Sequence, residues 1–271
     1  MASGYLIFAG SLAVAAASLS APALAQQVDE EPTLTAADLG LTEDQLESLI
    51  DGRATTGGAP GISFGSPVGF GASWGVIGAG IGGSTRDEGS QGRELDGSAG
   101  VVIGLGDAQN LVGAEVTYNI ISLEDQFAED GSFALKLHRN IGNGAFAVGV
   151  ENLGGYGAAK GADEAYFAAY SHVLTFPNDM PIVLSGGIGN ESFSNSTDRD
   201  GVGAFGSAAL LLNSRISAIA DYRGRGLSTA VSFTPFARLP LTATAGFINV
   251  YNEDDVNPEF SAGIGYSYSF K

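Results

Sequence analysis

The chain has two histidines, His138 and His172, the side chains best suited to general-base chemistry near neutral pH. A Ser/His/acid hydrolase needs a serine, a histidine and an orienting acid gathered in one patch. Ser171 precedes His172, but neighbours along a strand point to opposite faces and cannot form a nucleophile–base pair. His138 shares a strand face with Lys136 and Asn140, which suggests a barrel lumen. We interpret both histidines as ordinary polar side chains and expect no enzymatic activity.

Two acidic runs offer carboxylates to a divalent cation, at Asp198, Asp200, Glu253, Asp254 and Asp255. Neither run has the spacing of an EF-hand loop, so we interpret them as solvated loop residues and expect no metal site. Two glycine clusters, 78–83 and 186–189, could be mistaken for nucleotide loops. No helix follows either cluster, so no helix N-terminus is available to hold a phosphate, and we expect no cofactor.

The elements that carry these residues have a period of two from Phe70 onward, which is typical of β-strands. The last strand is the clearest: on one face lie Phe260, Ala262, Ile264, Tyr266, Tyr268 and Phe270, and on the other Ser261, Gly263, Gly265, Ser267 and Ser269. We expect the aromatic residues Tyr266, Tyr268 and Phe270 to face outward and the serines to face a lumen. Twelve strands are predicted, centred near residues 76, 100, 116, 136, 149, 170, 187, 207, 218, 230, 245 and 265.

The predicted connections alternate in length. Long ones fall near 85–94, 122–131, 154–163 and 193–200, and short ones near 107–110, 142–144, 177–181 and 213–214. A short exception at 223–226 is followed by 235–240 and a longer 251–258. Long loops outside and tight turns in the periplasm are the plan of an outer-membrane barrel, and an even strand count puts both termini on the periplasmic side. Acidic residues concentrate in the predicted outer loops.

A soluble β-sandwich or lipocalin-like barrel would also alternate, but its exposed face would be richer in Lys, Glu and Arg. Here the second face is mainly Gly, Ala and Ser, which covers a solvated surface poorly. Beyond the N-terminus no stretch of about twenty apolar residues exists, so helical spans are not expected. Aromatic residues gather near predicted strand ends, as in interfacial girdles: Phe70, Trp74, Tyr118, Tyr222, Phe233 and Phe236. We therefore predict an all-β, transmembrane, antiparallel up-and-down barrel of about twelve strands in a bacterial outer membrane.

Residues 1–25 are predicted to be a signal peptide, because an apolar stretch precedes the small-x-small site Ala23-Leu24-Ala25. The stretch lacks the usual Lys or Arg near its start. Residues 26–69 are predicted to be a periplasmic segment with a short helix, Thr42 to Asp51, and a Gly/Pro-rich linker. Thr42 and Gln45 match a capping box. The segment either leads up to the barrel or enters its lumen as a plug, and we favour the lead-in. Residues 70–271 form the predicted barrel.

The formal charge of −18, from 30 acidic and 12 basic residues, argues against nucleic-acid binding. Charged side chains predicted to line the lumen are Glu115, Lys136, His138, Glu151 and Asp221, with Arg215 possible near a turn. Such residues line a water-filled path or form a network that closes it. We favour a narrow passive channel for small solutes or cations. The alternative is a closed structural or assembly barrel, or an envelope-associated interaction protein without transport activity.

The end of the chain, Gly265-Tyr266-Ser267-Tyr268-Ser269-Phe270, resembles the terminal-strand signal read by the outer-membrane insertion machinery, although Lys271 follows the final aromatic residue. Three further blocks, 69–75, 135–139 and 233–240, resemble a family of cyanobacterial outer-membrane-type barrels of unknown function. The resemblance covers most of the chain after about Gly65. It implies a barrel in an outer membrane, with the lipid bilayer and the insertion machinery as partners, and it implies no catalytic or binding residues.

Overall fold

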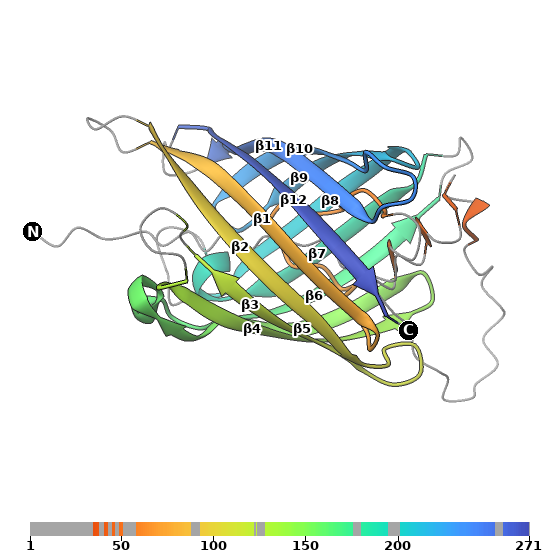
Figure 1. The fold of residues 1–271 in the computed structure, drawn as a ribbon, viewed down its shortest axis with the longest axis horizontal. Helices are drawn as coiled ribbons and strands as arrows, with labels where there is room; N and C mark the ends of the chain where they lie inside the picture. The colour runs from red at the N-terminus through yellow and green to blue at the C-terminus, as the bar shows by residue number, and fades with distance from the viewer. Residues whose placement is uncertain are drawn as a thin grey trace, which may run out of the picture.

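The fold is a closed barrel of twelve antiparallel strands, as the sequence predicts (Figure 1). The structure is a computed structural model that describes residues 35–37, 41–42, 45–46, 49–50, 58–87, 93–121, 123, 128–175, 180–194, 201–252 and 257–270. Each strand pairs with its neighbours in sequence, and β1 pairs with β12 to close the ring. In the described parts of the chain, no helix is long and apolar enough to span a membrane.

The strands are β1 (Val76–Asp87), β2 (Arg93–Gly106), β3 (Gly113–Ile120), β4 (Gly131–Ile141), β5 (Gly144–Tyr156), β6 (Ala165–Leu174), β7 (Ile182–Gly189), β8 (Gly203–Asn213), β9 (Ile216–Tyr222), β10 (Gly226–Phe233), β11 (Leu241–Asn252) and β12 (Glu259–Ser269). Two 3-10 helices, η3 (Gly157–Gly161) and η4 (Glu191–Phe193), lie in the connections that follow β5 and β7.

The connections divide between two ends of the barrel. The turn end holds the start of β1, the end of β12 and the tight turns 142–143 and 214–215. The opposite, loop end holds the longest connections, 121–130 and 190–202, and also the short exception at 223–225. The alternation in length is weaker than predicted, because connections of intermediate length also occur at the turn end.

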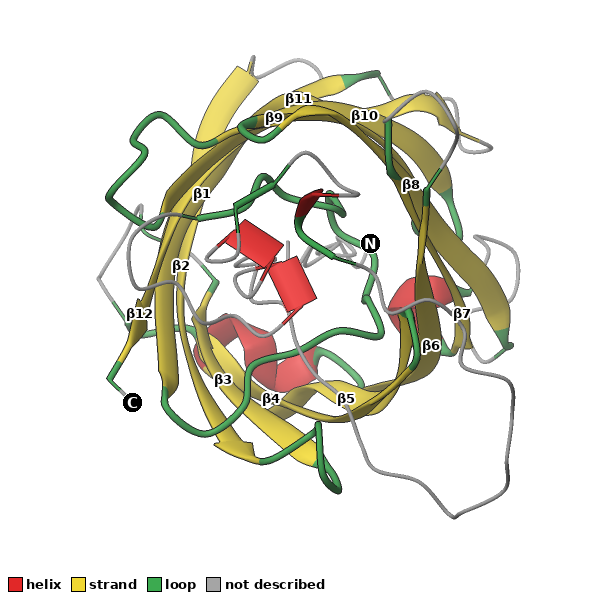
Figure 2. Ribbon diagram, turned by 90° about the vertical axis from the view of Figure 1, so that its right-hand side faces the viewer, coloured by secondary structure: helices red, strands yellow, loops and turns green. Residues whose placement is uncertain are grey.

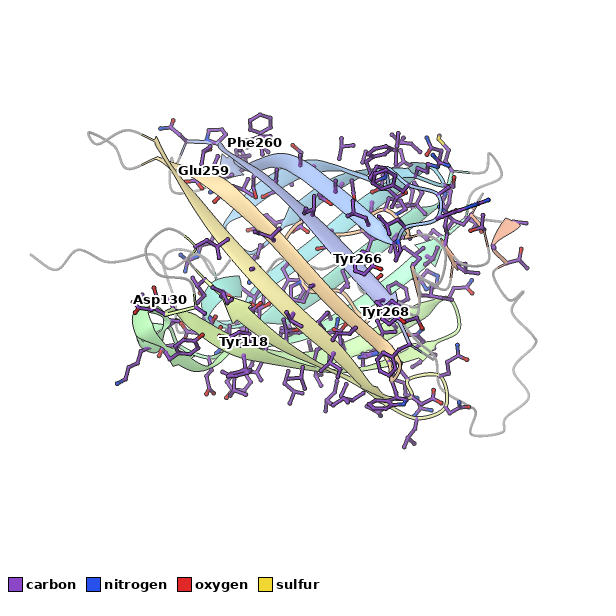
Figure 3. All side chains as sticks on the ribbon, viewed as in Figure 1. Tyr118, Asp130, Glu259, Phe260, Tyr266 and Tyr268 are labelled. Atoms are coloured by element: carbon purple, nitrogen blue, oxygen red, sulfur yellow. The ribbon has the colours of Figure 1, made fainter. Side chains whose placement is uncertain are left out.

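The outward face of the strands is apolar. Among the strand residues whose side chains the structure describes, Arg139 at the turn end is the only charged one that faces outward. Aromatic rings pair near both ends of this face: Trp74 with Phe270 and Phe146 with Tyr170 at the turn end, Tyr118 with Phe133 and Phe247 with Phe260 toward the loop end. Figure 3 labels Tyr118 and Phe260 of these pairs. An apolar belt between two aromatic girdles is the surface that a membrane barrel presents to lipid.

The inward face carries mainly small side chains. In β12, Tyr266, Tyr268 and the following Phe270 are exposed on the outside, whereas Ser267 is buried inside the ring. Serine, alanine and glycine together occupy most inward positions of β6 to β10, in the alternating burial pattern of those strands, and the larger exceptions include Phe167, Phe205 and Leu211. Small inward side chains leave space within a barrel of this size.

We predict that Ile264→Arg, in the middle of β12, destabilises the barrel by about 2–4 kcal/mol when it is folded in lipid bilayers, because the guanidinium would enter hydrocarbon. Ile264 is 48% exposed and paired with Ile81 of β1. The control is Leu111→Arg, which is 67% exposed in a turn-end connection and should change the unfolding free energy by less than about 0.5 kcal/mol. The measurement is a denaturant titration of folding into lipid vesicles. An equally small loss of unfolding free energy for both variants would contradict a lipid-facing belt.

Candidate functional site

The first strand begins later than predicted. Residues 70–75 precede β1 without strand structure, and Phe70 is only 1% exposed, so it does not belong to an outer aromatic girdle. Its neighbours explain the difference: a Cβ on Gly69 would lie 2.0 Å from the carbonyl oxygen of Ala145. The backbone at Gly69 therefore packs directly on the wall of the barrel, where only glycine fits.

Residues 58–75, here called the lumenal segment, lie inside the ring of strands as far as Ser73, and Trp74 then lies on the outer face. Figure 2 looks into the barrel from the turn end and shows described segments enclosed by the strands. The segment first contacts the turn-end halves of β9 to β11. Thr242 donates to the carbonyl of Ala59 at 3.1 Å, Ser232 accepts from the N–H of Gly61 at 2.8 Å, and Ser217 donates to the carbonyl of Gly61 at 2.5 Å. The linker therefore enters the barrel, the less favoured of the two alternatives above.

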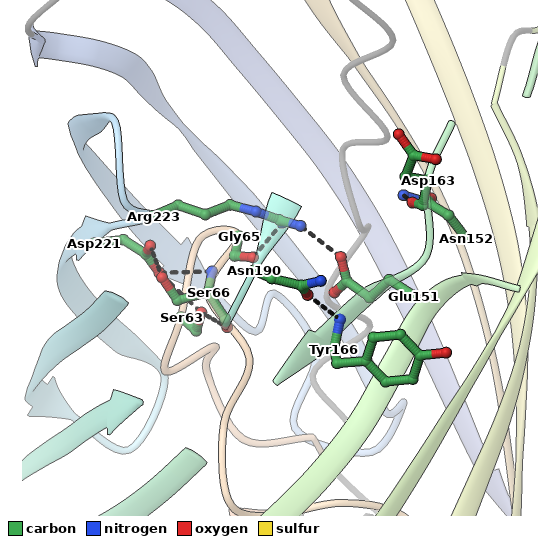
Figure 4. Close-up of polar contacts among 10 residues, drawn as sticks. All are labelled: Ser63, Gly65, Ser66, Glu151, Asn152, Asp163, Tyr166, Asn190, Asp221 and Arg223. Atoms are coloured by element: carbon green, nitrogen blue, oxygen red, sulfur yellow. Dashed lines mark hydrogen bonds and ion pairs between the residues drawn. The ribbon is translucent and has the colours of Figure 1, made fainter. Parts of the chain in front are cut away.

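Farther along, the segment wraps around Asp221, an inward-facing residue of β9 that is 1% exposed (Figure 4). One carboxylate oxygen accepts hydrogen bonds from the backbone N–H of Phe64 at 2.7 Å and of Ser66 at 3.2 Å, and from the hydroxyl of Ser63 at 2.8 Å. The other accepts the Ser66 hydroxyl at 2.5 Å. A buried carboxylate is costly unless such donors compensate its desolvation.

Near the loop end, Arg223 joins the segment to two parts of the wall. Its guanidinium donates to the carbonyl of Gly65 at 2.5 Å and to Glu151 at 2.6 Å (Figure 4). It also lies over the ring of Phe193, 5.0 Å from the centroid, within cation–π range. Phe193 belongs to η4 and is fully buried against Phe167 and Phe205. The connection after β7 thus folds into the barrel beside the segment.

The segment then returns toward the turn end along β3, β4 and β6. Gly69 donates its N–H to Ser171 at 2.8 Å, and Lys136 donates to the carbonyl of Phe70 at 2.7 Å. Glu115 accepts the N–H of Ala72 at 2.5 Å and forms an ion pair with Lys136. Lys136 therefore donates to a backbone carbonyl of the segment and Glu115 accepts from a backbone N–H, so both members of the ion pair bind the segment through its backbone.

The imidazole of His138 is enclosed beside this ion pair. A Cβ on Gly71 would lie 2.7 Å from its Nδ1, and a Cβ on Gly113 would lie 2.4 Å from its Nε2. The ring is 2% exposed, between the lumenal segment and β3. A histidine in this position packs the segment against the wall and has no access for a substrate.

An apolar cluster completes the closure at the turn end. It joins Leu41, Leu49, Ile62 and Phe70 to inward-facing residues of β5 to β10, among them Val173, Val183, Leu211 and Ile219. The predicted capping box is present: Gln45 N–H donates to Thr42 Oγ1 at 3.2 Å, and Thr42 N–H donates to Gln45 Oε1 at 3.1 Å. The Gln45 side chain also donates to the carbonyl of Ser214 in the turn-end connection 214–215, at 2.5 Å.

The predicted lumen-lining residues are strand residues that the structure gathers around the lumenal segment. Glu115, Lys136, His138, Glu151 and Asp221 all face inward and contact it or its anchors. Arg215 instead lies exposed in the connection 214–215 at the turn end, and no described contact joins it to the lumenal segment. The lumenal cation that sequence reasoning missed is Arg223. It follows Asp221 by two residues, and that same-face spacing was the available signal.

Ser171 and His172 point to opposite faces, as expected. Ser171 is buried inside, whereas His172 is partly exposed outside and accepts or donates to the Tyr170 hydroxyl at 3.0 Å. The acidic loop candidates Asp198, Asp200, Glu253, Asp254 and Asp255 lie outside the described residues. Within the described ranges, no three His, Cys, Asp or Glu side chains gather as a metal-binding group. No protein-family model and no curated protein matches the chain.

We predict that Lys136→Met destabilises the protein by about 3–5 kcal/mol, because Glu115 keeps a buried charge without a cation. Adding Glu115→Gln to the same chain should recover more than half of that loss, since the amide is neutral. The measurement is the free energy of unfolding in detergent micelles. A double variant as unstable as Lys136→Met alone would show that the ion pair does not account for the loss.

Proposed function

We propose that the protein is an outer-membrane β-barrel that forms a narrow channel for small solutes or cations and is gated by its own lumenal segment. The proposal for the membrane rests on the outward face, where an apolar belt almost free of charge lies between aromatic pairs near both ends. Such a face in water would be an aggregation surface far larger than a monomer tolerates. The even strand count puts the start of β1 and the end of β12 at the same end of the barrel, as the prediction of periplasmic termini requires.

The single observation that carries the gating proposal is that the lumenal charges bind the segment. Glu115, Lys136, Asp221 and Arg223 each bond to its backbone or hydroxyl groups. Inward residues of the turn-end half are fully buried beneath it, including Ser171, Val183, Ala209, Ser217 and Ser232. This conformation is therefore the closed state of the proposed channel.

The wall behind the segment favours a gate over a permanent seal. A barrel closed by its own wall is filled by large side chains from its strands. Here β6 to β10 contribute mostly serine, alanine and glycine, and a separate stretch of chain supplies much of the filling, packed against the few large inward residues such as Val183, Leu211 and Ile219. When the segment moves away, water can replace its hydrogen bonds to the serines and the carboxylates at modest net cost.

The apolar cluster is the observation that favours the second candidate, a closed structural or assembly barrel. Displacing the segment would expose Leu41, Leu49, Ile62 and Phe70, each worth about 1.5–3 kcal/mol of burial. Conductance distinguishes the two candidates. A gate opens when its contacts are weakened, whereas a permanent filling unfolds with the barrel. The outer-membrane insertion machinery, which would read β12, and the resemblance to cyanobacterial barrels remain part of the proposal.

We predict that Gly69→Val opens the channel. The new side chain must overlap the carbonyl oxygen of Ala145, so the segment has to move and the closed state loses about 1–3 kcal/mol, which raises the ratio of open to closed channels about 5- to 150-fold. The measurement is single-channel conductance of the full chain in planar bilayers.

The matched control for this release variant is Gly161→Val in η3, where an added Cβ meets nothing within 4 Å. It should conduct as rarely as the unmodified protein. A Gly69→Val protein that keeps its β-sheet circular dichroism and still shows no conductance would favour the closed structural barrel.

A further inference from the structure

We propose that Asp221, flanked by Ser207 and Ser228, is a monovalent-cation site of the open lumen, and that residues 63–66 occupy it as an internal ligand in the closed state. The inference rests on the proposed channel function and adds where a cation is selected and what competes with it. It places cation selectivity in the interior of the barrel.

The site consists of three residues that are paired side by side on β8, β9 and β10. Ser207 of β8 and Ser228 of β10 are the register partners of Asp221 on either side, and all three side chains are buried on the inward face. Directly paired residues have Cβ atoms about 4.5–5.5 Å apart, so three oxygen-bearing side chains line one level of the lumen. A carboxylate flanked by hydroxyl oxygens is a hard-oxygen set that suits an alkali cation.

Charge singles out Asp221 from the other lumenal acids. Glu115 is paired with Lys136 and Glu151 with Arg223, and each pair has no net charge. Among the described residues, none forms an ion pair with Asp221, and its partners are the neutral donors of residues 63–66. When those donors leave, Asp221 holds a negative charge that has no ion-pair partner among the described residues.

In the closed state the Asp221 carboxylate is surrounded by partial positive charges, as it would be by a bound cation. Two backbone N–H groups and the Ser66 hydroxyl direct their hydrogens at the carboxylate, and the single hydrogen of the Ser63 hydroxyl is shared between it and the carbonyl of Ser66. The hydroxyl of Ser207 donates to the carbonyl of Ile62 at 3.3 Å. A cation and the segment therefore require the same carboxylate oxygens. By linkage, a cation bound at Asp221 lowers the affinity of the segment for the wall, and the bound segment lowers the affinity for the cation by the same factor.

Two substitutions of Asp221 separate the effect of its charge from the effect of its hydrogen-bond geometry with residues 63–66. Asp221→Asn removes the charge and the second acceptor oxygen, and Asp221→Glu keeps the charge but moves the carboxylate by a methylene group. Both should raise the open probability about tenfold or more, because both disturb the contacts with residues 63–66. Reversal potentials in a tenfold KCl gradient, with potassium as the probe, should show cation preference for Asp221→Glu and for Gly69→Val. The preference should fall to about one for Asp221→Asn.

The control is Asp163→Asn, an exposed carboxylate in the connection between β5 and β6 at the loop end. Introduced into the Gly69→Val background, it should leave the reversal potential unchanged. Equal cation preference in Asp221→Asn and Asp221→Glu would overturn the cation site and leave the gate standing. An absence of conductance in all of these variants, Gly69→Val included, would overturn the channel itself and the site with it.

Discussion

The hydrogen bonds between the backbone of residues 58–75 and the inward-facing side chains of the barrel are the interaction on which the rest of the structure depends. They require wall positions that are small and polar, and they require glycine where the two backbones meet, as at Gly69. They also explain why a barrel interior can carry buried charges. Each charge has its desolvation offset by a partner on the wall, by a backbone group of the segment, or by both.

The same constraint links the two faces of each strand. In β9, Ser217, Ile219 and Asp221 face the segment, while Ala218, Ala220 and Tyr222 form the outer surface. A one-residue slip of register would bring Asp221 to the apolar belt and a tyrosine into the lumen. Binding of the segment and the proposed insertion in lipid therefore depend on one register, fixed around the ring by the pairing of β1 with β12.

Much of this architecture could be predicted from the sequence because a strand side chain has only two directions. The period of two located the strands and the inward positions of Glu115, Lys136 and Asp221. The short local signal of Thr42 and Gln45 located a capping box. The position of the linker could not be predicted, because residues 58–75 bind mainly through N–H and carbonyl groups, which leave no periodic pattern of side chains. Phe70 was therefore predicted to lie in an aromatic girdle, because nothing in its sequence context indicates that it lies inside the barrel. Arg223 falls in a predicted connection, and its contacts with Glu151 and Gly65 depend on the position of the segment.

The most direct test of the segment's place in the lumen is a single disulfide. The chain has no cysteine, and a Cβ on Gly61 would lie 3.4 Å from the Cβ of Ser232, close to the separation found in disulfides. The double variant Gly61→Cys/Ser232→Cys, folded in vesicles and mildly oxidised, should form an intramolecular bond in nearly all molecules, measured by mass and by the loss of free thiols. Free thiols at both positions in a folded barrel would contradict the account, because the segment would then lie outside the lumen.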